Sequence, residues 1–103
     1  NINGSGLAKG AANDSGNVAF TGTNAQTVSA NYNLGNSLNR LESIKISNTS
    51  TAGVTLSSDS YVGNIDFNQT SGIAKLSVDS GKIIDVSSRK STHTPGKYVG
   101  LGN

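Results

Sequence analysis

The chain has no cysteine and no methionine among its 103 residues, and it has only one proline. The lack of cysteine excludes disulfide bonds, thiolate metal sites and a cysteine nucleophile. Because position 1 is not methionine, we expect a processed product or a piece of a longer protein, with any targeting segment already removed. No apolar run approaches the roughly 18 residues that a membrane-spanning helix needs, so we expect no membrane span in this chain.

Large apolar and charged residues are also scarce. Hydrophobic residues make up 33% of the chain, aromatic residues 5% and charged residues 14%, with a net charge of +2. The low charge argues against disorder, and the length leaves room for one domain at most. In place of these residues the chain carries 16 serines, 13 asparagines, 13 glycines and 9 threonines. This mixture is typical of short strands joined by tight turns, since Gly and Asn accept the positive φ angles of turns.

Pairs of apolar residues separated by one residue recur along the chain, and such pairs place two side chains on one face of a strand. The pairs are Val18/Phe20, Val28/Ala30, Ile44/Ile46, Val54/Leu56, Ile65/Phe67, Leu76/Val78 and Ile84/Val86. Two successive steps span roughly 21 residues, a length that suits one coil of a repeat fold. We therefore predict an all-β fold, a β-helix or β-solenoid with short strands and Gly/Asn turns; the alternative is an antiparallel β-sandwich.

The phrase GNVAF at residues 16–20 returns as GNIDF at residues 63–67. We predict that both are the same strand seen two coils apart, with a small insertion within residues 31–43. Within that stretch Leu34, Leu38 and Leu41 have helix-like spacing, which predicts a brief helical turn. The predicted organisation is an N-terminal arm or cap at 1–15, a solenoid-like core at 16–88 and a basic tail at 89–103.

Candidate site residues are few. Glycoside hydrolysis requires two carboxylates in one groove, for which Asp59, Asp66, Asp79 and Asp85 are the candidates. We instead expect a solvated face on which Lys45, Lys75 and Lys82 pair with these acids. His93 is the only histidine and lies beside Pro95, so a metal site there would need ligands from elsewhere. Arg89, Lys90, His93 and Lys97 have no interleaved aromatic residues, as a single-strand nucleic-acid site would require. We assign no catalytic, cofactor-binding or metal-binding residue and expect no nucleic-acid partner.

Three phrases in residues 16–86 resemble the passenger domains of bacterial autotransporters, most of all the rickettsial outer-membrane surface antigens. The phrases are GNVAFTGTNAQTVSANYN, LESIKISNTSTAGVTL and VGNIDFNQTSGIAKLSVDSGKIIDV. The family combines degenerate "GN-[VI]-x-F" strands, turns rich in Ser, Thr and Asn, no cysteine and few aromatic residues. The resemblance implies a secreted β-helix on the bacterial cell surface that works in adhesion or as a protective layer. No protease motif such as G-D-S-G is present, so no functional residue is carried over.

These features favour a non-catalytic structural or adhesive surface module, with a host or cell-surface receptor as its partner. The alternative is a self-assembling subunit of an extracellular fibre, pilus or phage tail structure, joined through its end strands. A polysaccharide-active β-helix enzyme is the third hypothesis and requires two of the four aspartates to converge.

Overall fold

The computed structural model describes residues 1–67, 73–87, 91–93 and 98–102. In these residues the structure is all-β and contains no helix, as the sequence predicts. The strands are β1 (Ser5–Ala8), β2 (Asn17–Phe20), β3 (Gln26–Val28), β4 (Asn31–Leu34), β5 (Leu41–Ile46), β6 (Val54–Leu56), β7 (Ser60–Phe67), β8 (Ile73–Val78), β9 (Ile84–Val86), β10 (Ser91–His93) and β11 (Tyr98–Gly102).

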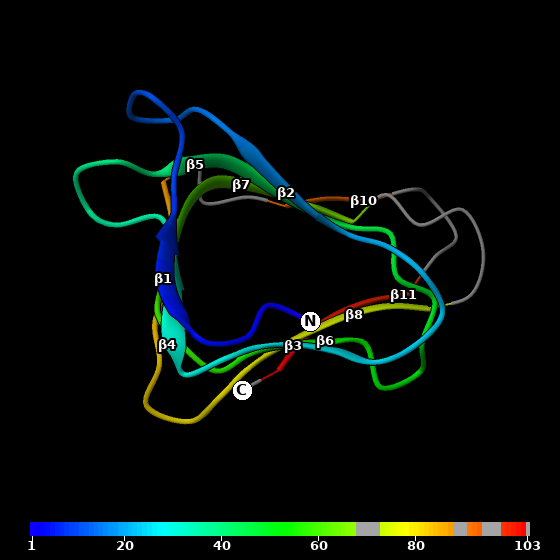
Figure 1. Ribbon diagram of the computed structural model, residues 1–103. Coiled ribbons are helices and arrows are strands. Elements are labelled where there is room, and N and C mark those ends of the chain that lie inside the picture. The colour runs from blue at the N-terminus through cyan, green and yellow to red at the C-terminus, as the bar shows by residue number, and fades with distance from the viewer. Residues whose placement is uncertain (68–72, 88–90, 94–97, 103) are drawn as a thin grey trace.

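The strands lie along three sides of a triangle when the molecule is viewed down one axis (Figure 1). The first side holds β1, β4, the start of β7, and β9; the second side holds β2, β5, the remainder of β7, and β10. The third side is a separate sheet in the order β11-β8-β6-β3. Every pairing between these strands is parallel. The alternative of an antiparallel β-sandwich is therefore wrong for the described residues.

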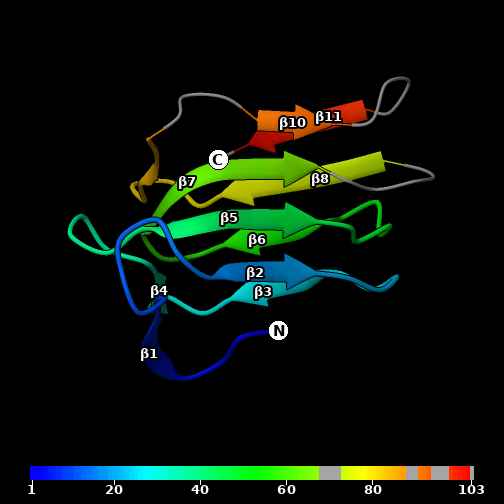
Figure 2. The same cartoon turned by 90° about the horizontal axis from the view of Figure 1, so that it is seen from above.

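Along the chain, the strands group into four layers, which Figure 2 shows one above another. We number them from the N-terminus: β1–β3, β4–β6, β7 and β8, and β9–β11. Parallel strands need a connection long enough to bring the chain back to the same side, and here it runs through the other two sides. Partner residues in adjacent layers are 21 to 28 residues apart, as for Ser43 with Asn64 and for Gln26 with Val54. The predicted period of 21 is therefore the shortest one observed.

The repeated phrases GNVAF and GNIDF lie on the second side, two layers apart. Val18 is in register with Ile44, which is in register with Ile65. The longer first step has a local cause. A loop at residues 35–40 separates β4 from β5, whereas β7 runs through the equivalent corner without interruption. This confirms the predicted relation between the phrases and places the insertion inside residues 31–43.

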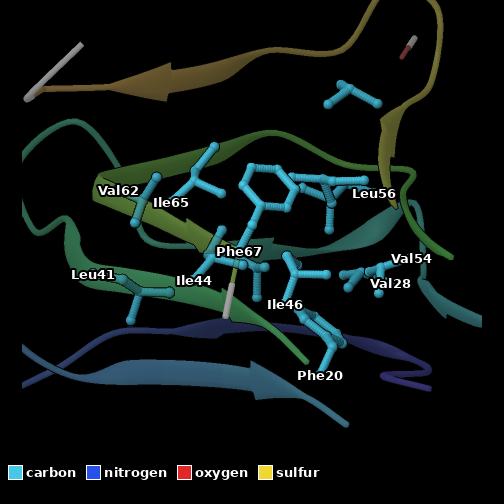
Figure 3. Close-up of a cluster of buried hydrophobic side chains, with 13 residues drawn as sticks. Phe20, Val28, Leu41, Ile44, Ile46, Val54, Leu56, Val62, Ile65 and Phe67 are labelled. Carbon is cyan, nitrogen blue, oxygen red and sulfur yellow. The ribbon is translucent and has the colours of Figure 1, made fainter. Parts of the chain in front are cut away.

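The core lies inside the triangle and is made of side chains that alternate along the strands (Figure 3). Phe20, Ile46 and Phe67 share one register column, and each is at most 3% exposed. The other buried apolar residues are Val28, Leu34, Leu41, Ile44, Val54, Leu56, Val62, Ile65, Leu76 and Val78. The narrow interior explains how a chain with so few large residues closes a core, since each layer contributes only a few inward side chains.

The predicted helical turn is wrong. Leu34 and Leu41 are buried in separate strands, and Leu38 between them is 80% exposed. Gly35 adopts a positive φ of 72° directly after β4, which turns the chain away from both helix and strand. The prediction for Val28/Ala30 is wrong in its second residue, because β3 ends at Val28 and Ala30 is exposed.

Both predicted terminal segments contain strands. β1 lies within residues 1–15 and pairs with β4, and Ile2 forms a bridge to Val28. β10 and β11 lie within residues 89–103 and pair with β7 and β8. His93 is the last residue of β10. The other residues of the basic segment, Arg89, Lys90 and Lys97, lie outside the described residues, as does Pro95. No helix in the described part of the chain has the length and hydropathy needed to span a membrane.

Candidate functional site: a pair of loops at one corner

The four candidate aspartates come from different parts of the triangle. Asp66 lies on the second side in register with Lys45, while Asp85 lies on the first side in register with Tyr61. Asp59 precedes β7 and accepts the backbone N–H of Ile83 at 3.0 Å, and Asp79 directly follows β8. Asp85 forms an ion pair with Arg40 and not with one of the three predicted lysines. In the described residues, no cluster of three His, Cys, Asp or Glu side chains is placed to hold a metal ion.

Two loops project from the corner where the first and second sides meet, and we call residues 9–16 and 35–40 the loop pair (Figure 1). The first loop joins β1 to β2, and the second joins β4 to β5 in the next layer. In the third layer, β7 crosses this corner as one strand. A Cβ atom at Gly63 in β7 would lie 3.4 Å from Asp14 Oδ1 of the first loop, and a Cβ atom at Gly35 of the second loop would collide with the carbonyl oxygen of Tyr61 in β7. The loop pair therefore rests closely on β7.

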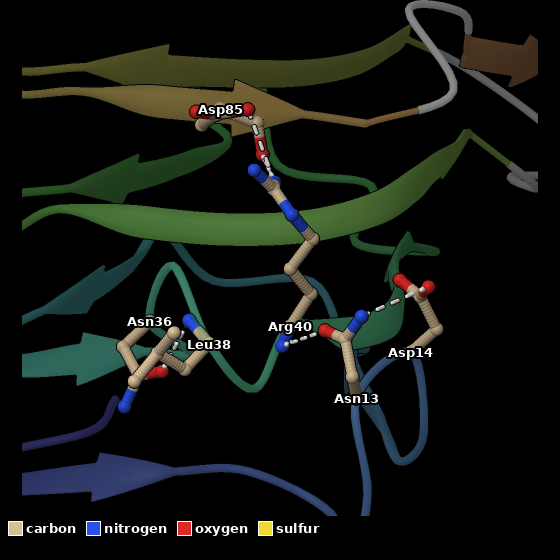
Figure 4. A network of polar contacts seen from close by, with 6 residues as sticks. All are labelled: Asn13, Asp14, Asn36, Leu38, Arg40 and Asp85. Atoms are coloured by element: carbon tan, nitrogen blue, oxygen red, sulfur yellow. Dashed lines mark hydrogen bonds and ion pairs between the residues drawn. The ribbon is translucent and has the colours of Figure 1, made fainter.

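Hydrogen bonds join the two loops to each other (Figure 4). The backbone N–H of Arg40 donates to Asn13 Oδ1 at 2.9 Å. The carbonyl oxygen of Arg40 accepts the N–H groups of Asp14 at 2.9 Å and Ser15 at 3.3 Å. Asp14 has a φ of 60°, a conformation that asparagine and aspartate tolerate better than most residues. These contacts make the two loops one unit.

The second loop is also ordered from within. Asn36 Oδ1 accepts the N–H groups of Leu38 at 2.9 Å and Asn39 at 2.8 Å, and the Asn36 N–H donates to the Asn39 carbonyl at 3.0 Å. Such a side-chain turn is a common role of asparagine. It holds Leu38 outward at the tip of the loop with 80% of its surface exposed. The tip thus presents an apolar side chain from a backbone that is already fixed.

The side chain of Arg40 runs from the loop pair across the first side. Its guanidinium carbon lies 5.8 Å from the centre of the Tyr61 ring. Nη1 donates to the carbonyl oxygen of Asp85 at 3.0 Å and lies 3.0 Å from Asp85 Oδ1. Arg40 is therefore shared between a cation–π contact, a hydrogen bond and an ion pair.

This corner presents groups that are suited to contact with a partner. It offers amide groups, main-chain hydrogen bonds and a projecting leucine, in an arrangement typical of recognition loops on a rigid scaffold. Two other large hydrophobic residues are strongly exposed in the described part of the chain, Leu7 at 41% and Ile83 at 48%. Leu7 belongs to β1, and Ile83 directly precedes β9, so both lie by the first side.

The sequence does not predict the loop pair. The spacing of Leu34, Leu38 and Leu41 predicts a helical turn in place of the second loop, and the first loop falls almost wholly within the predicted N-terminal arm or cap. The useful signal was local: Gly35 followed by Asn36 marks a turn, which separates the buried leucines on either side. Comparison with known proteins adds no further assignment, since no protein-family model, no curated protein and no solved structure matches the chain.

Proposed function

We propose that the chain is a β-solenoid module of a bacterial cell surface, secreted and non-catalytic, with a structural and adhesive role. The observation that carries the proposal is the parallel register that repeats from layer to layer on all three sides. In a solenoid each layer needs only its neighbours, so the body is a scaffold whose outer surface is free to vary. The resemblance of residues 16–86 to autotransporter passengers supports the location and the adhesive role.

We place the contact with a receptor on the loop pair. Leu38 is the most exposed large hydrophobic residue of the described chain, and its loop is fixed by Asn36 before any partner arrives. A preformed loop loses little conformational entropy on binding, so more of the contact energy appears as affinity. A receptor that contacts the tip of this loop would bury the Leu38 side chain, and removing that apolar surface from water favours binding.

The test is a cell-binding assay with beads that carry the purified chain. Beads coated with the wild-type chain are expected to bind cultured epithelial cells well above albumin-coated beads. Leu38→Asp should abolish the difference, because it places a charge at the centre of the contact. Thr51→Asp adds the same charge in an exposed turn at another corner and should leave binding unchanged. Wild-type beads that bind no better than albumin beads would overturn the adhesive role; equal loss in both variants would overturn the assignment to the loop pair.

The second candidate function is a subunit of an extracellular fibre, pilus or phage tail structure. The observation in its favour is that β1 and β2 each pair along one edge only in the described chain, and free strand edges recruit other strands. Sedimentation velocity separates the two candidates. A species of constant mass across a hundredfold range of concentration supports the module, whereas growth into large particles supports the fibre.

A further inference from the structure

One chain of contacts at the loop corner touches all four layers. Asn13 belongs to the first layer and holds the backbone of Arg40 in the second. The Arg40 side chain then passes Tyr61 in the third layer and reaches Asp85 in the fourth. The strand pairings on this side join adjacent layers, whereas the Arg40 side chain runs from the second layer to the fourth.

The Arg40 side chain reaches β9, a short strand with little buried apolar surface. β9 has three residues and none of them is fully buried, whereas β4 and the start of β7 on the same side contribute the fully buried Leu34 and Val62. Its backbone is held by pairing with β7 and by the hydrogen bonds Ser60 N–H to the Ile83 carbonyl and Ser87 N–H to the Val62 carbonyl. Short elements with little buried apolar surface open first under native conditions.

We propose that Arg40 is a strap that couples the conformation of the loop pair to the order of β9. The side chains of the ion pair are 17% exposed for Arg40 and 37% for Asp85, so solvent screens the contact only in part. The main chain of the same residue is fixed by Asn13, Asp14 and Ser15. A displacement of the loop therefore withdraws the guanidinium from Asp85 and frees β9 to open. By linkage, a change that orders β9 also holds the loop in place. The coupling does not depend on the proposed adhesive role, so either can be refuted without the other.

Hydrogen exchange on the whole chain tests the strap. In Arg40→Met, the amides of residues 83–87 should exchange about tenfold faster, because one charge-assisted hydrogen bond and one ion pair are lost. Lys82→Met removes the same charge from an exposed turn next to β9 and should change exchange there by less than about twofold. Amides of β5 and β6 serve as the internal reference and should not change.

The decisive variant is Asn13→Ala, because Asn13 lies three layers from β9. Its side chain accepts the backbone N–H of Arg40, and its other hydrogen bond goes to Asp14 within the first loop. Coupling predicts that exchange at residues 83–87 rises about threefold in this variant, and that adding it to Arg40→Met has little further effect. If Asn13→Ala changes exchange only in residues 9–16 and 35–40, the ion pair is local and the coupling is refuted. If Arg40→Met unfolds the chain, Asp85→Asn gives the same test from the other end, with a smaller increase because its backbone carbonyl still accepts the hydrogen bond.

Discussion

Gly35 begins the second loop of the loop pair, and replacing it by alanine tests how closely that loop packs on β7. Its φ of 72° is unfavourable for alanine, and a Cβ atom would collide with the carbonyl oxygen of Tyr61. The same Cβ would lie 3.1 Å from the backbone nitrogen of Leu41 and 3.3 Å from the carbonyl of Asn39. Because these neighbours are main-chain atoms, they cannot turn aside as a flexible side chain would.

Gly22 provides the matched control. It has a φ of 90°, and a Cβ atom there would have no neighbour within 4 Å. Gly22→Ala therefore carries the left-handed strain of about 1–2 kcal/mol, reduced by the roughly 0.4–1 kcal/mol that alanine gains by restricting the unfolded chain. We expect a net loss of about 0.5–1 kcal/mol. Gly35→Ala carries the same terms and also the overpacking, which costs about 1–3 kcal/mol, so its free energy of unfolding should fall by about 1.5–4 kcal/mol.

Urea unfolding followed by far-ultraviolet circular dichroism measures both variants. The difference in free energy of unfolding between Gly35→Ala and Gly22→Ala isolates the close approach, because the conformational strain is common to both. A difference below about 0.5 kcal/mol, within the error of such extrapolations, would refute the packing of the loop against β7.

Substitutions at three further positions test a buried corner, the core and the loop tip. The fully buried Asn48 side chain donates to the carbonyls of Thr21 and Asn24 and accepts the Ser50 N–H. Asn48→Ala should therefore lower the free energy of unfolding by about 2–3 kcal/mol, and Asn48→Asp should lower it by at least as much. A urea titration of both variants measures these losses. Ile44→Ala should cost about 2–5 kcal/mol in the same titration, since Ile44 is completely buried between two layers; a loss below about 1 kcal/mol would contradict its place in the core. Leu38→Ala should change the midpoint of thermal unfolding by no more than the equivalent of about 0.5 kcal/mol, so any loss of cell binding in that variant would come from the surface.

The apolar pairs predicted most of the core because each pair records two inward positions of a strand. Ile44/Ile46, Val54/Leu56, Ile65/Phe67 and Leu76/Val78 supply eight of the buried hydrophobic residues. The pattern failed where a strand contributes one large inward residue. β4 has Tyr32 half-buried beside Leu34, and β1 has Gly6 and Ala8 on its inward positions. Such strands are stabilised by pairing with the strands of neighbouring layers, and this pairing cannot be predicted from a short stretch of sequence.

The candidate site was less predictable than the core. Asp85 could be placed on the outer surface from its position between Ile84 and Val86. Its partner could not, because Arg40 is 45 residues away in sequence and reaches it across an intervening strand. The loop pair depends on the lengths of two connections in successive layers, which become neighbours only once the register is known. The place proposed for the receptor contact therefore follows from the folded corner and not from a sequence motif.

Nuclear Overhauser contacts between methyl groups of the wild-type chain test whether successive layers stack in parallel register. Parallel stacking predicts contacts from Val18 to Ile44 and from Ile44 to Ile65 on the second side, and from Val54 to Leu76 on the third. It predicts none between Val18 and Ile65, which lie two layers apart, roughly 9–10 Å by strand spacing. A direct contact between Val18 and Ile65 without Ile44 between them, or cross-strand contacts of antiparallel type, would contradict the account.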